Sequence, residues 1–229
     1  MTHSGAHSRA HSWAPAVSEG RIEIMRLDFD LSAPWSEADW DALSAEERER
    51  ALRFLRHEDR LRMIATRASL RRLIGERLRV APAALRFDAG HYGKLELVGA
   101  GVFFNVSHSG EFALIALSKH WDVGVDIERI DVTADIPGLA AVALTREEGE
   151  GIDAAGFFER WVAKEATLKA VGLGIAEKLQ AFSVQPGQGD FYELHHAEAD
   201  WGDLRVARLA APPGYAAALA WKTPSAPGG

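Results

Sequence analysis

The stretch from Val123 to Glu128 limits the possible folds of this 229-residue chain more than any other part of its sequence. Apolar residues alternate there with small or acidic ones, in the order Val123, Gly124, Val125, Asp126, Ile127, Glu128. Because successive side chains of a strand point to opposite faces, this order predicts a strand with one apolar face and two carboxylates on the other. Neighbouring anions need a cation or a shared proton, and carboxylate oxygens suit Mg²⁺ better than zinc. The plainer alternative is a strand at the edge of a sheet whose charges face water.

A third carboxylate, Glu165, lies in a predicted helix that covers residues 157–169. Phe158, Trp161, Glu165 and Leu168 fall at helical spacing, so Glu165 shares a stripe with apolar side chains. Burying a carboxylate without a partner is very costly. Two partners are open at this point: Lys169, four residues further along the helix, or the same cation that the carboxylates of the strand require.

Positive charge is concentrated in the first half of the chain. Between Glu46 and Arg79 there are eleven arginines against six acidic residues, although the whole chain has a formal net charge of −7. Ser44 and Glu47 have the spacing of a capping box, which predicts a helix to about Leu55, followed by a longer amphipathic helix to about Arg79. The arginines can form a solvated helix face or a cradle for a polyanionic ligand. Nucleic acid is a weaker interpretation, because no nucleic-acid motif accompanies the arginines.

Short apolar segments with glycine-rich turns predict antiparallel strands rather than alternating strands and helices. The order strand, helices, strands occurs roughly twice, and the second pass begins near Ser118. This order predicts an α+β fold of two similar halves with a site between them. A polar segment, Asn105–Gly110, precedes a strand at 112–118 that is apolar enough to be buried on both faces. Within it, Ser107 and His108 offer the donors of an anion pocket, whereas a Ser–His nucleophile is disfavoured because no G-x-S-x-G motif is present.

Composition narrows the class of protein further. The chain has no cysteine, which excludes disulfides and thiolate catalysis. It has no apolar run long enough to span a bilayer and no hydrophobic signal core, so we expect a soluble cytoplasmic protein without a membrane partner. Residues 1–19 are rich in His, Ser and Ala and are predicted to be a disordered tail, as are residues 223–229.

Three motifs taken together resemble the Sfp-type phosphopantetheinyl transferases, in the subgroup with a Trp before Lys-Glu-Ala. They are Asn105–Ser109, Val123–Glu128 and Trp161–Lys169, in this order and at about these separations. The resemblance extends from about Leu43 to Trp221. It implies two halves related by a pseudo-twofold, each a small antiparallel sheet packed on helices, with the active site at their interface. The implied halves are residues 20–118, which anchor coenzyme A, and 119–222, which carry the metal-binding carboxylates and the catalytic helix.

The resemblance also implies an activity. Such an enzyme transfers the 4'-phosphopantetheine group of coenzyme A to a serine of an acyl or peptidyl carrier protein, depends on Mg²⁺, and releases adenosine 3',5'-bisphosphate. The carrier could serve fatty acid, polyketide or nonribosomal peptide synthesis, and two halves in one chain make a monomer the default. Two alternatives use the same residues differently: a Mg²⁺-dependent hydrolase of nucleotide pyrophosphates, and a module that binds nucleic acid or an acidic partner.

Particular residues receive roles from the same resemblance. Asp126, Glu128 and Glu165 are the implied Mg²⁺ ligands, and Glu165 is also the implied base for the serine. The implied catalytic residues are Glu165, Lys169 and Asp126. The implied contacts to coenzyme A are Arg50, Arg53, Lys94, Ser107, His108 and Lys169. Glu47 and Met63 depart from the pattern, because some relatives carry a cation and a hydroxyl at these two positions.

Overall fold

The structure is a computed structural model that describes residues 8–13, 21–90, 94–99, 101–173, 178–196, 201 and 203–223. Its α-helices are α1 (Glu37–Ala42), α2 (Ala45–Leu52), α3 (His57–Leu78), α4 (Ile136–Ala143), α5 (Arg146–Gly149) and α6 (Ala154–Val171). Two short 3-10 helices are η2 (Pro82–Ala84) and η4 (Leu179–Ala181). Its strands are β1 (Ser8–Trp13), β2 (Ile22–Phe29), β3 (Phe87–Ala89), β4 (Leu95–Leu97), β5 (Phe103–Ser109), β6 (Phe112–Ser118), β7 (Asp122–Arg129), β8 (Phe182–Pro186), β9 (Phe191–His196), β10 (Asp203–Arg208) and β11 (Tyr215–Thr223).

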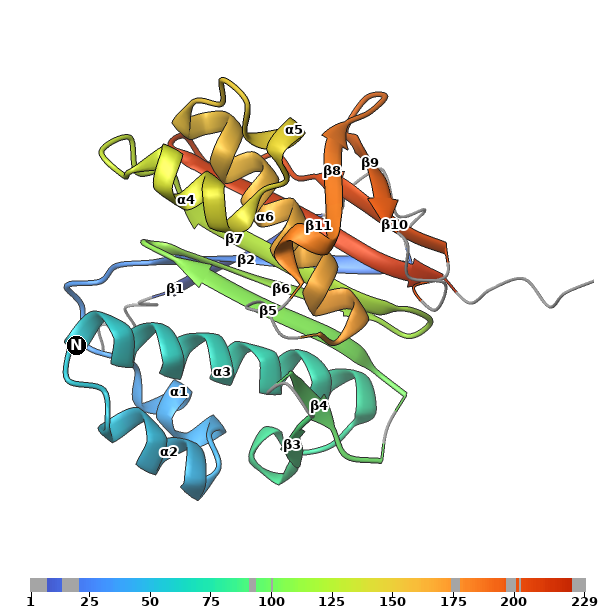
Figure 1. Ribbon diagram of the computed structural model, residues 1–229. Helices are drawn as coiled ribbons and strands as arrows, with labels where there is room; N and C mark the ends of the chain where they lie inside the picture. Colours follow the sequence, from blue (N-terminus) through green and yellow to red (C-terminus); the bar gives the residue numbers. More distant parts are fainter. Residues whose placement is uncertain are drawn as a thin grey trace, which may run out of the picture.

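Two antiparallel sheets form the centre of the fold. One has the strand order β1-β2-β6-β5 and the other the order β7-β11-β10-β9-β8, while β3 and β4 form a separate hairpin. In the first half β2 pairs with β6, and β6 pairs with β5. In the second half β7 pairs with β11, and β11 pairs with β10. The first and last strands of each half are therefore neighbours. Helices α1 to α3 lie on one side of the paired sheets and α4 to α6 on the other (Figure 1). The prediction of an α+β fold with two similar halves is confirmed.

Three apolar layers hold these elements together. The first packs α3 against the four-stranded sheet, through residues such as Leu27, Leu61 and Ile115. The second lies between the two sheets, and the third packs α6 against the five-stranded sheet. Strand β7 gives Val123, Val125 and Ile127 to the layer between the sheets. Its other face is therefore left for Asp126 and Glu128, as the alternating sequence predicts.

The sequence signals at the helix ends are present in the structure. Ser44 and Glu47 form a capping box at the start of α2, and Thr145 and Glu148 form a second one at α5. Strand β6 is buried along almost its whole length, in agreement with its apolar sequence. None of the helices in the described part of the chain is long and apolar enough to cross a membrane.

The predicted disordered tail at residues 1–19 is wrong for residues 8–13. This segment forms β1, which pairs antiparallel with β2 from Ser8 opposite Phe29 to Trp13 opposite Ile24. Backbone pairing at the open edge of β2 satisfies strand hydrogen bonds without requiring an apolar pattern in β1, and composition alone does not reveal it. The other residues of the two predicted tails, 1–7, 14–19 and 224–229, lie outside the described residues.

Candidate active site

The face of β7 that carries the carboxylates is covered by α6. The helix backbone comes so close to the strand that a side-chain carbon at Gly124 would lie 2.0 Å from the carbonyl oxygen of Ala166. The absence of a side chain at Gly124 therefore permits this approach. The close packing places Glu165, which is 5% exposed, opposite Asp126, which is 2% exposed. The helix carboxylate and that of Asp126 are thereby brought to one ammonium group, that of Lys169.

Asp126 lies at the centre of the polar contacts. Its Oδ1 accepts hydrogen bonds from the Ser107 hydroxyl at 2.7 Å and from the Lys169 ammonium at 2.5 Å. Lys169 Nζ is also 3.8 Å from Glu165 Oε2, so this one ammonium group joins the strand to the helix. Asp126 Oδ2 is buried and has no hydrogen-bond partner among the described residues. Lys169 is thus shared between two carboxylates, rather than forming a plain pair with Glu165.

The crowding of anions changes how the site titrates. Burial and the charges of Asp126 and Glu128 raise the pKa of Glu165 to about 7. Burial also raises the pKa of Glu128, and the Asp126 carboxylate adds to this effect. Burial alone would lower the pKa of Lys169, but the carboxylates around it outweigh burial and raise it. The cluster therefore carries more negative charge than its single ammonium group offsets.

The chemistry of this cluster fits a divalent cation. The Asp126, Glu128 and Glu165 carboxylates are close enough to affect one another's charge, and among the described residues Asp126 Oδ2 is buried without a hydrogen-bond partner. Hard oxygen ligands of this kind are the ones that Mg²⁺ takes in proteins. Within the part of the chain that the structure describes, no three His, Asp or Glu side chains already stand at the spacing of metal ligands. The ammonium of Lys169 is the positive group in contact with the carboxylates in this arrangement.

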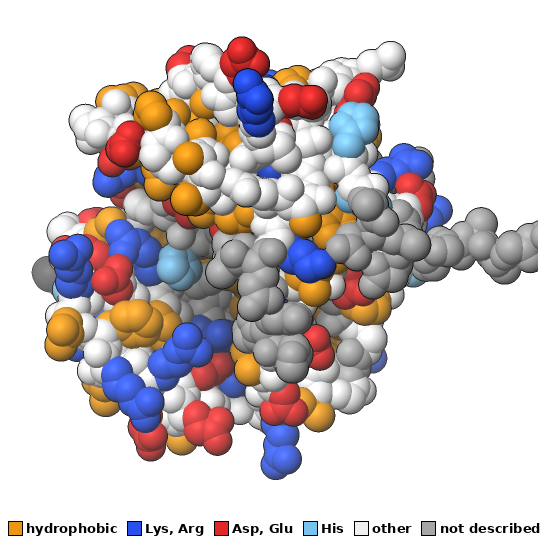
Figure 2. All heavy atoms as spheres, in the orientation of Figure 1, with side chains coloured by type: hydrophobic (Ala, Val, Ile, Leu, Met, Phe, Trp, Pro, Cys, Tyr) orange, Lys and Arg blue, Asp and Glu red, His pale blue; other side chains and the backbone are white. Residues whose placement is uncertain are grey.

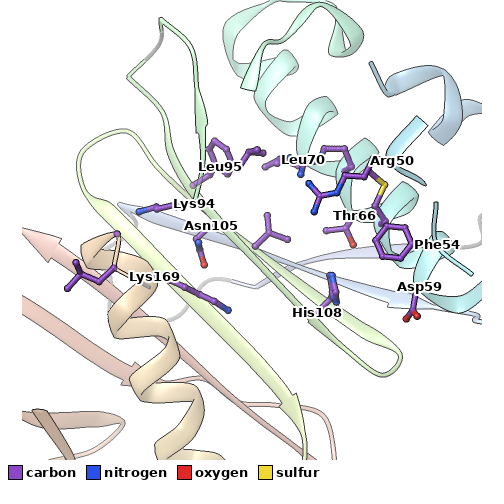
Figure 3. A pocket seen from close by; sticks show the side chains of 16 residues that line it. Arg50, Phe54, Asp59, Thr66, Leu70, Lys94, Leu95, Asn105, His108 and Lys169 are labelled. Carbon is purple, nitrogen blue, oxygen red and sulfur yellow. The ribbon is translucent and has the colours of Figure 1, made fainter. Parts of the chain in front are cut away.

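A cavity of about 420 Å³ adjoins the carboxylates. Lys169 enters it from α6, Arg50 and Thr66 face it from α2 and α3, and Asn105 and His108 lie between them (Figure 3). Its walls combine apolar side chains with positive charge, and its cationic groups and histidine are Arg50, Arg67, Lys94, Lys169 and His108. Figure 2 shows Lys and Arg side chains gathered over α2 and α3 on this face of the molecule. Such a cavity suits a ligand with an apolar body and several negative groups.

Ion pairs within the arginine-rich helices decide which cations reach the cavity. Glu47 binds Arg71 at 2.6 Å and Arg67 at 3.2 Å, through different carboxylate oxygens. Arg71 is almost fully buried and also donates to the carbonyl oxygens of η2 and its flank, whereas Arg67 lies in the cavity wall. The unusual Glu47 therefore holds two arginines in place instead of supplying a cation itself.

The structure separates the predicted site residues into three groups. Asp126, Glu128, Glu165, Lys169 and Ser107 come together at the carboxylates. Arg50, Lys94, His108 and Lys169 line the cavity, where Lys94 is also 3.6 Å from Asp122.

Arg53 is not part of the cavity lining and lies in a neighbouring surface hollow with Glu46 and Glu49. This hollow adjoins the cavity, because Arg50 and Phe54 line both. Ser107 bonds the Asp126 carboxylate rather than facing the cavity.

Sequence reasoning missed several residues of the site. Thr66 lines the cavity with a buried hydroxyl that has no hydrogen-bond partner in the described part of the chain, and Arg67 and Asn105 also form part of the wall. Ser109 donates to Glu128 at 2.8 Å. Ser109 belongs to the polar segment that precedes β6 and follows Ser107 by two residues, so strand periodicity could have placed both on the same side.

The fold and the paired carboxylate site define a two-half α+β enzyme that handles a polyanionic substrate beside acidic residues, and comparison with known proteins identifies the family. Sequence models described as "4'-phosphopantetheinyl transferase superfamily" and "4'-phosphopantetheinyl transferase, N-terminal" match residues 122–220 and 32–120. A putative 4'-phosphopantetheinyl transferase of Synechocystis sp. is 34% identical over 167 residues, which are 65% of this chain and 68% of that protein. The 4'-phosphopantetheinyl transferase HetI of Nostoc sp. is 32% identical over 183 residues, 73% and 77% of the two chains. The chain belongs to the 4'-phosphopantetheinyl transferase family and is an enzyme of that class.

Proposed function

We propose that this enzyme transfers the 4'-phosphopantetheine group of coenzyme A to a serine of an acyl or peptidyl carrier protein, by a site built on Asp126, Glu128, Glu165 and Lys169. One observation carries the proposal. Lys169 lines the cavity while its ammonium contacts Asp126 at 2.5 Å and lies 3.8 Å from Glu165, so carboxylates from two distant segments meet where a ligand can enter. Among the reactions that such a site could perform, membership of the 4'-phosphopantetheinyl transferase family favours this one.

The carboxylates of Asp126, Glu128 and Glu165 are the groups that would hold Mg²⁺. When bound, the ion would offset negative charge on the pyrophosphate of coenzyme A, which is the usual contribution of Mg²⁺ to phosphoryl chemistry. The buried Oδ2 of Asp126, which has no partner, supports this assignment. Lys169 supplies a fixed positive charge beside the same phosphates.

Glu165 is the proposed base. The serine oxygen of the carrier forms a bond to the phosphorus that bears the pantetheine group, and the bond from that phosphorus to the bridging oxygen of the pyrophosphate breaks. The serine proton passes to the Glu165 carboxylate, and adenosine 3',5'-bisphosphate departs with the bonding electrons. Without a cation, burial and Asp126 raise the pKa of Glu165 to about 7, and a bound Mg²⁺ would lower it.

The cavity is the proposed site for the nucleotide part of coenzyme A. Arg50, Lys94 and His108 were predicted for this role, and their presence in the cavity wall supports it. We add Arg67 and the hydroxyl of Thr66, which stand near Glu47 and Met63, the two departures from the family pattern. Arg53 lines the neighbouring hollow rather than the cavity, so it is the weakest of the predicted contacts.

Finer features follow the same proposal. The Trp161 to Lys169 motif supports the Sfp-type subgroup, in which residues 20–118 would anchor coenzyme A and residues 119–222 would carry the catalytic groups. Two halves in one chain favour a monomer that needs no second copy to complete its site. We propose that it works in the cytoplasm, without nucleic acid.

The test is intact-mass analysis of apo carrier proteins after incubation with coenzyme A and Mg²⁺. We expect wild-type enzyme to add the mass of one phosphopantetheine group, and Glu165→Gln to slow this transfer about 100-fold to 10,000-fold, as loss of a general base does. Asp126→Asn should have an effect of the same order. The matched control is Glu159→Gln, because Glu159 lies on the same helix but pairs with Arg208 at the surface.

Two outcomes would contradict the proposal. Full transfer by both Glu165→Gln and Asp126→Asn would remove these residues from the reaction. Rapid consumption of coenzyme A in the absence of any carrier would instead indicate the pyrophosphate hydrolase, in which water is the attacking group.

A further inference from the structure

We propose that Ser109 is a positioning residue for the carboxylate of Glu128, as the last member of a row of β5 side chains that attaches β7 to the other half of the molecule. The row consists of Asn105, Ser107 and Ser109. This inference rests on the proposed function, because it treats Glu128 as a ligand of a divalent cation.

The row replaces a backbone ladder between two strands. Strands β5 and β7 end different sheets, so their facing edges are not joined by the pairing that holds each sheet together. Instead, backbone amides of β7 donate to side-chain oxygens of β5, from Val125 to Asn105 at 2.9 Å, from Ile127 to Ser107 at 3.3 Å and from Arg129 to Ser109 at 3.1 Å. The partners differ by 20 residues in all three bonds, so the strands run in the same direction in one register.

Two members of the row also contact a carboxylate. The Ser107 hydroxyl donates to Asp126 Oδ1 at 2.7 Å, and the Ser109 hydroxyl donates to Glu128 Oε2 at 2.8 Å. A hydroxyl group has a single hydrogen. Because each serine oxygen accepts a hydrogen bond from a backbone amide of β7, its own hydrogen is free to point to the carboxylate. The backbone of β7 therefore fixes the direction in which each serine donates to the acidic residue that precedes its amide partner.

Ser109 matters more for Glu128 than Ser107 does for Asp126. Asp126 is held by Lys169 as well as by Ser107. Glu128 has a longer side chain with more rotamers, and within the described part of the chain Ser109 is its hydrogen-bond donor. Anchoring Oε2 reduces the entropy that Glu128 would lose on binding a cation. Groups that orient metal ligands in this way typically change metal affinity by 10-fold to 100-fold when removed.

Asn105 provides a matched control. Asn105 Oδ1 accepts a hydrogen bond from the Val125 amide of β7, just as Ser109 accepts one from Arg129. Among the described residues, Asn105 donates no hydrogen bond to a carboxylate. Loss of either side chain should loosen the attachment of β7, and only loss of Ser109 should release Glu128. Ser109→Ala is expected to fold, because the amide of Arg129 that it leaves without a partner is exposed to solvent.

The experiment measures Mn²⁺ affinity of the full chain with coenzyme A and without carrier, by relaxation of water protons, so that no transfer takes place. We expect Ser109→Ala to bind Mn²⁺ about 10-fold more weakly than wild type, with a similar increase in the Mg²⁺ concentration needed for transfer and little change in the KM for coenzyme A. Ser109→Thr keeps the hydroxyl and should retain the affinity. Because Asn105 lies in the cavity wall, Asn105→Ala should lower the melting temperature and raise the KM for coenzyme A, but at saturating coenzyme A it should leave Mn²⁺ affinity unchanged.

Wild-type affinity in Ser109→Ala, or an equal loss in Asn105→Ala, would overturn the inference and leave the proposed function intact. Failure of wild-type enzyme to bind Mn²⁺ would overturn the proposed metal ligands and this inference with them.

Discussion

The two halves of the molecule solve one packing problem with the same arrangement. In each, a glutamate of a capping box reaches a buried cation on the long helix that follows, and that cation also donates to carbonyl oxygens in or beside a short 3-10 helix. The first half uses Glu47, Arg71 and the carbonyls of Pro82 and Leu85. The second uses Glu148, Lys164 and the carbonyls of Leu179 and Phe182.

The halves differ in what lies between the first strand and the long helix. Strand β2 gives Leu27 and Phe29 to an apolar layer beneath α3. Strand β7 instead presents Asp126 and Glu128 to α6, together with Gly124. Each half has its own buried cation that fixes the long helix, Arg71 in α3 and Lys164 in α6, so the carboxylates between β7 and α6 do not have to hold α6 in place. The layer between β7 and α6 therefore carries the proposed catalytic residues, whereas the corresponding layer between β2 and α3 is apolar core.

The largest expected effect tests the shared arrangement. Glu148→Ala should destabilise the protein by about 3 to 5 kcal/mol in urea unfolding, because it leaves the Lys164 ammonium buried without its counter-ion. Glu148 and Lys164 side chains are fully buried, whereas Glu47 is 14% exposed, so Glu47→Ala should cost less. Both variants lose a capping box, which makes the pair a fair comparison.

Replacing the whole pair gives the control for this prediction. Glu148→Leu combined with Lys164→Met should recover much of the loss, because apolar side chains can replace a buried ion pair. Equal destabilisation by Glu148→Ala and Glu47→Ala would show that burial does not distinguish the halves.

The carboxylates of the second half predict a pH dependence that the apolar layer of the first half lacks. The pKa of Glu165 is raised from 4.5 to about 7 by burial and by Asp126, so its stabilising effect is complete below pH 4.5 and is lost as the pH rises through 7. In protein freed of metal by a chelator, we expect this group to cost about 3 kcal/mol of unfolding free energy across that range. Urea unfolding at several pH values measures it.

Glu165→Gln should remove this part of the pH dependence, whereas the surface variant Glu159→Gln should keep it. Mg²⁺ added above pH 7 should restore stability to wild type and not to Glu165→Gln. An identical pH profile in wild type and Glu165→Gln would contradict the assignment.

Sequence reasoning located the elements better than the contacts between them. Ser44 with Glu47 and the stripe that contains Glu165 are signals within one turn or two of a helix, so spacing along the chain predicted them correctly. The bond from Ser107 to Asp126, and that from Arg71 to Glu47, connect elements far apart in sequence. Local periodicity gives the face on which such a residue lies, but not the partner that tertiary packing brings to it.

The same limit explains the errors in the cavity. Arg50 and Arg53 looked equivalent in sequence because residues three apart share a helix face, yet Arg50 lines the cavity and Arg53 does not. Helix α2 ends at Leu52, so Arg53 lies beyond its last helical residue. Arg67 was one of many arginines on an amphipathic helix, and its place depends on Glu47. Helix α1 had no periodic pattern of its own and was not predicted.

Close packing at Gly124 predicts a smaller effect that is confined to the second half. In Gly124→Ala the new carbon would lie 2.0 Å from the Ala166 carbonyl oxygen and 2.5 Å from the Ala170 amide nitrogen, so α6 must move away from β7. We expect a loss of about 1 to 3 kcal/mol, typical of overpacking, together with slower transfer because α6 carries Glu165 and Lys169. Gly101→Ala is the control, since no atom lies within 4 Å of a carbon added there. Equal stability of the two variants would argue against the close approach.

The smallest change in stability is expected for an ion pair on β2 that is accessible to water. Arg26 binds Asp28 at 2.8 Å, and both side chains are about one third exposed, at 30% and 32%. A pair so accessible to water contributes at most about 1 kcal/mol, so Arg26→Ala should lower the unfolding free energy by less than that and leave transfer unchanged. A double-mutant cycle with Asp28→Ala measures the coupling. The coupling of Arg26 with Asp28 should be much smaller than that of Glu148 with Lys164, which is fully buried. Equal coupling energies for the two pairs would mean that burial does not determine how strongly an ion pair stabilises this protein.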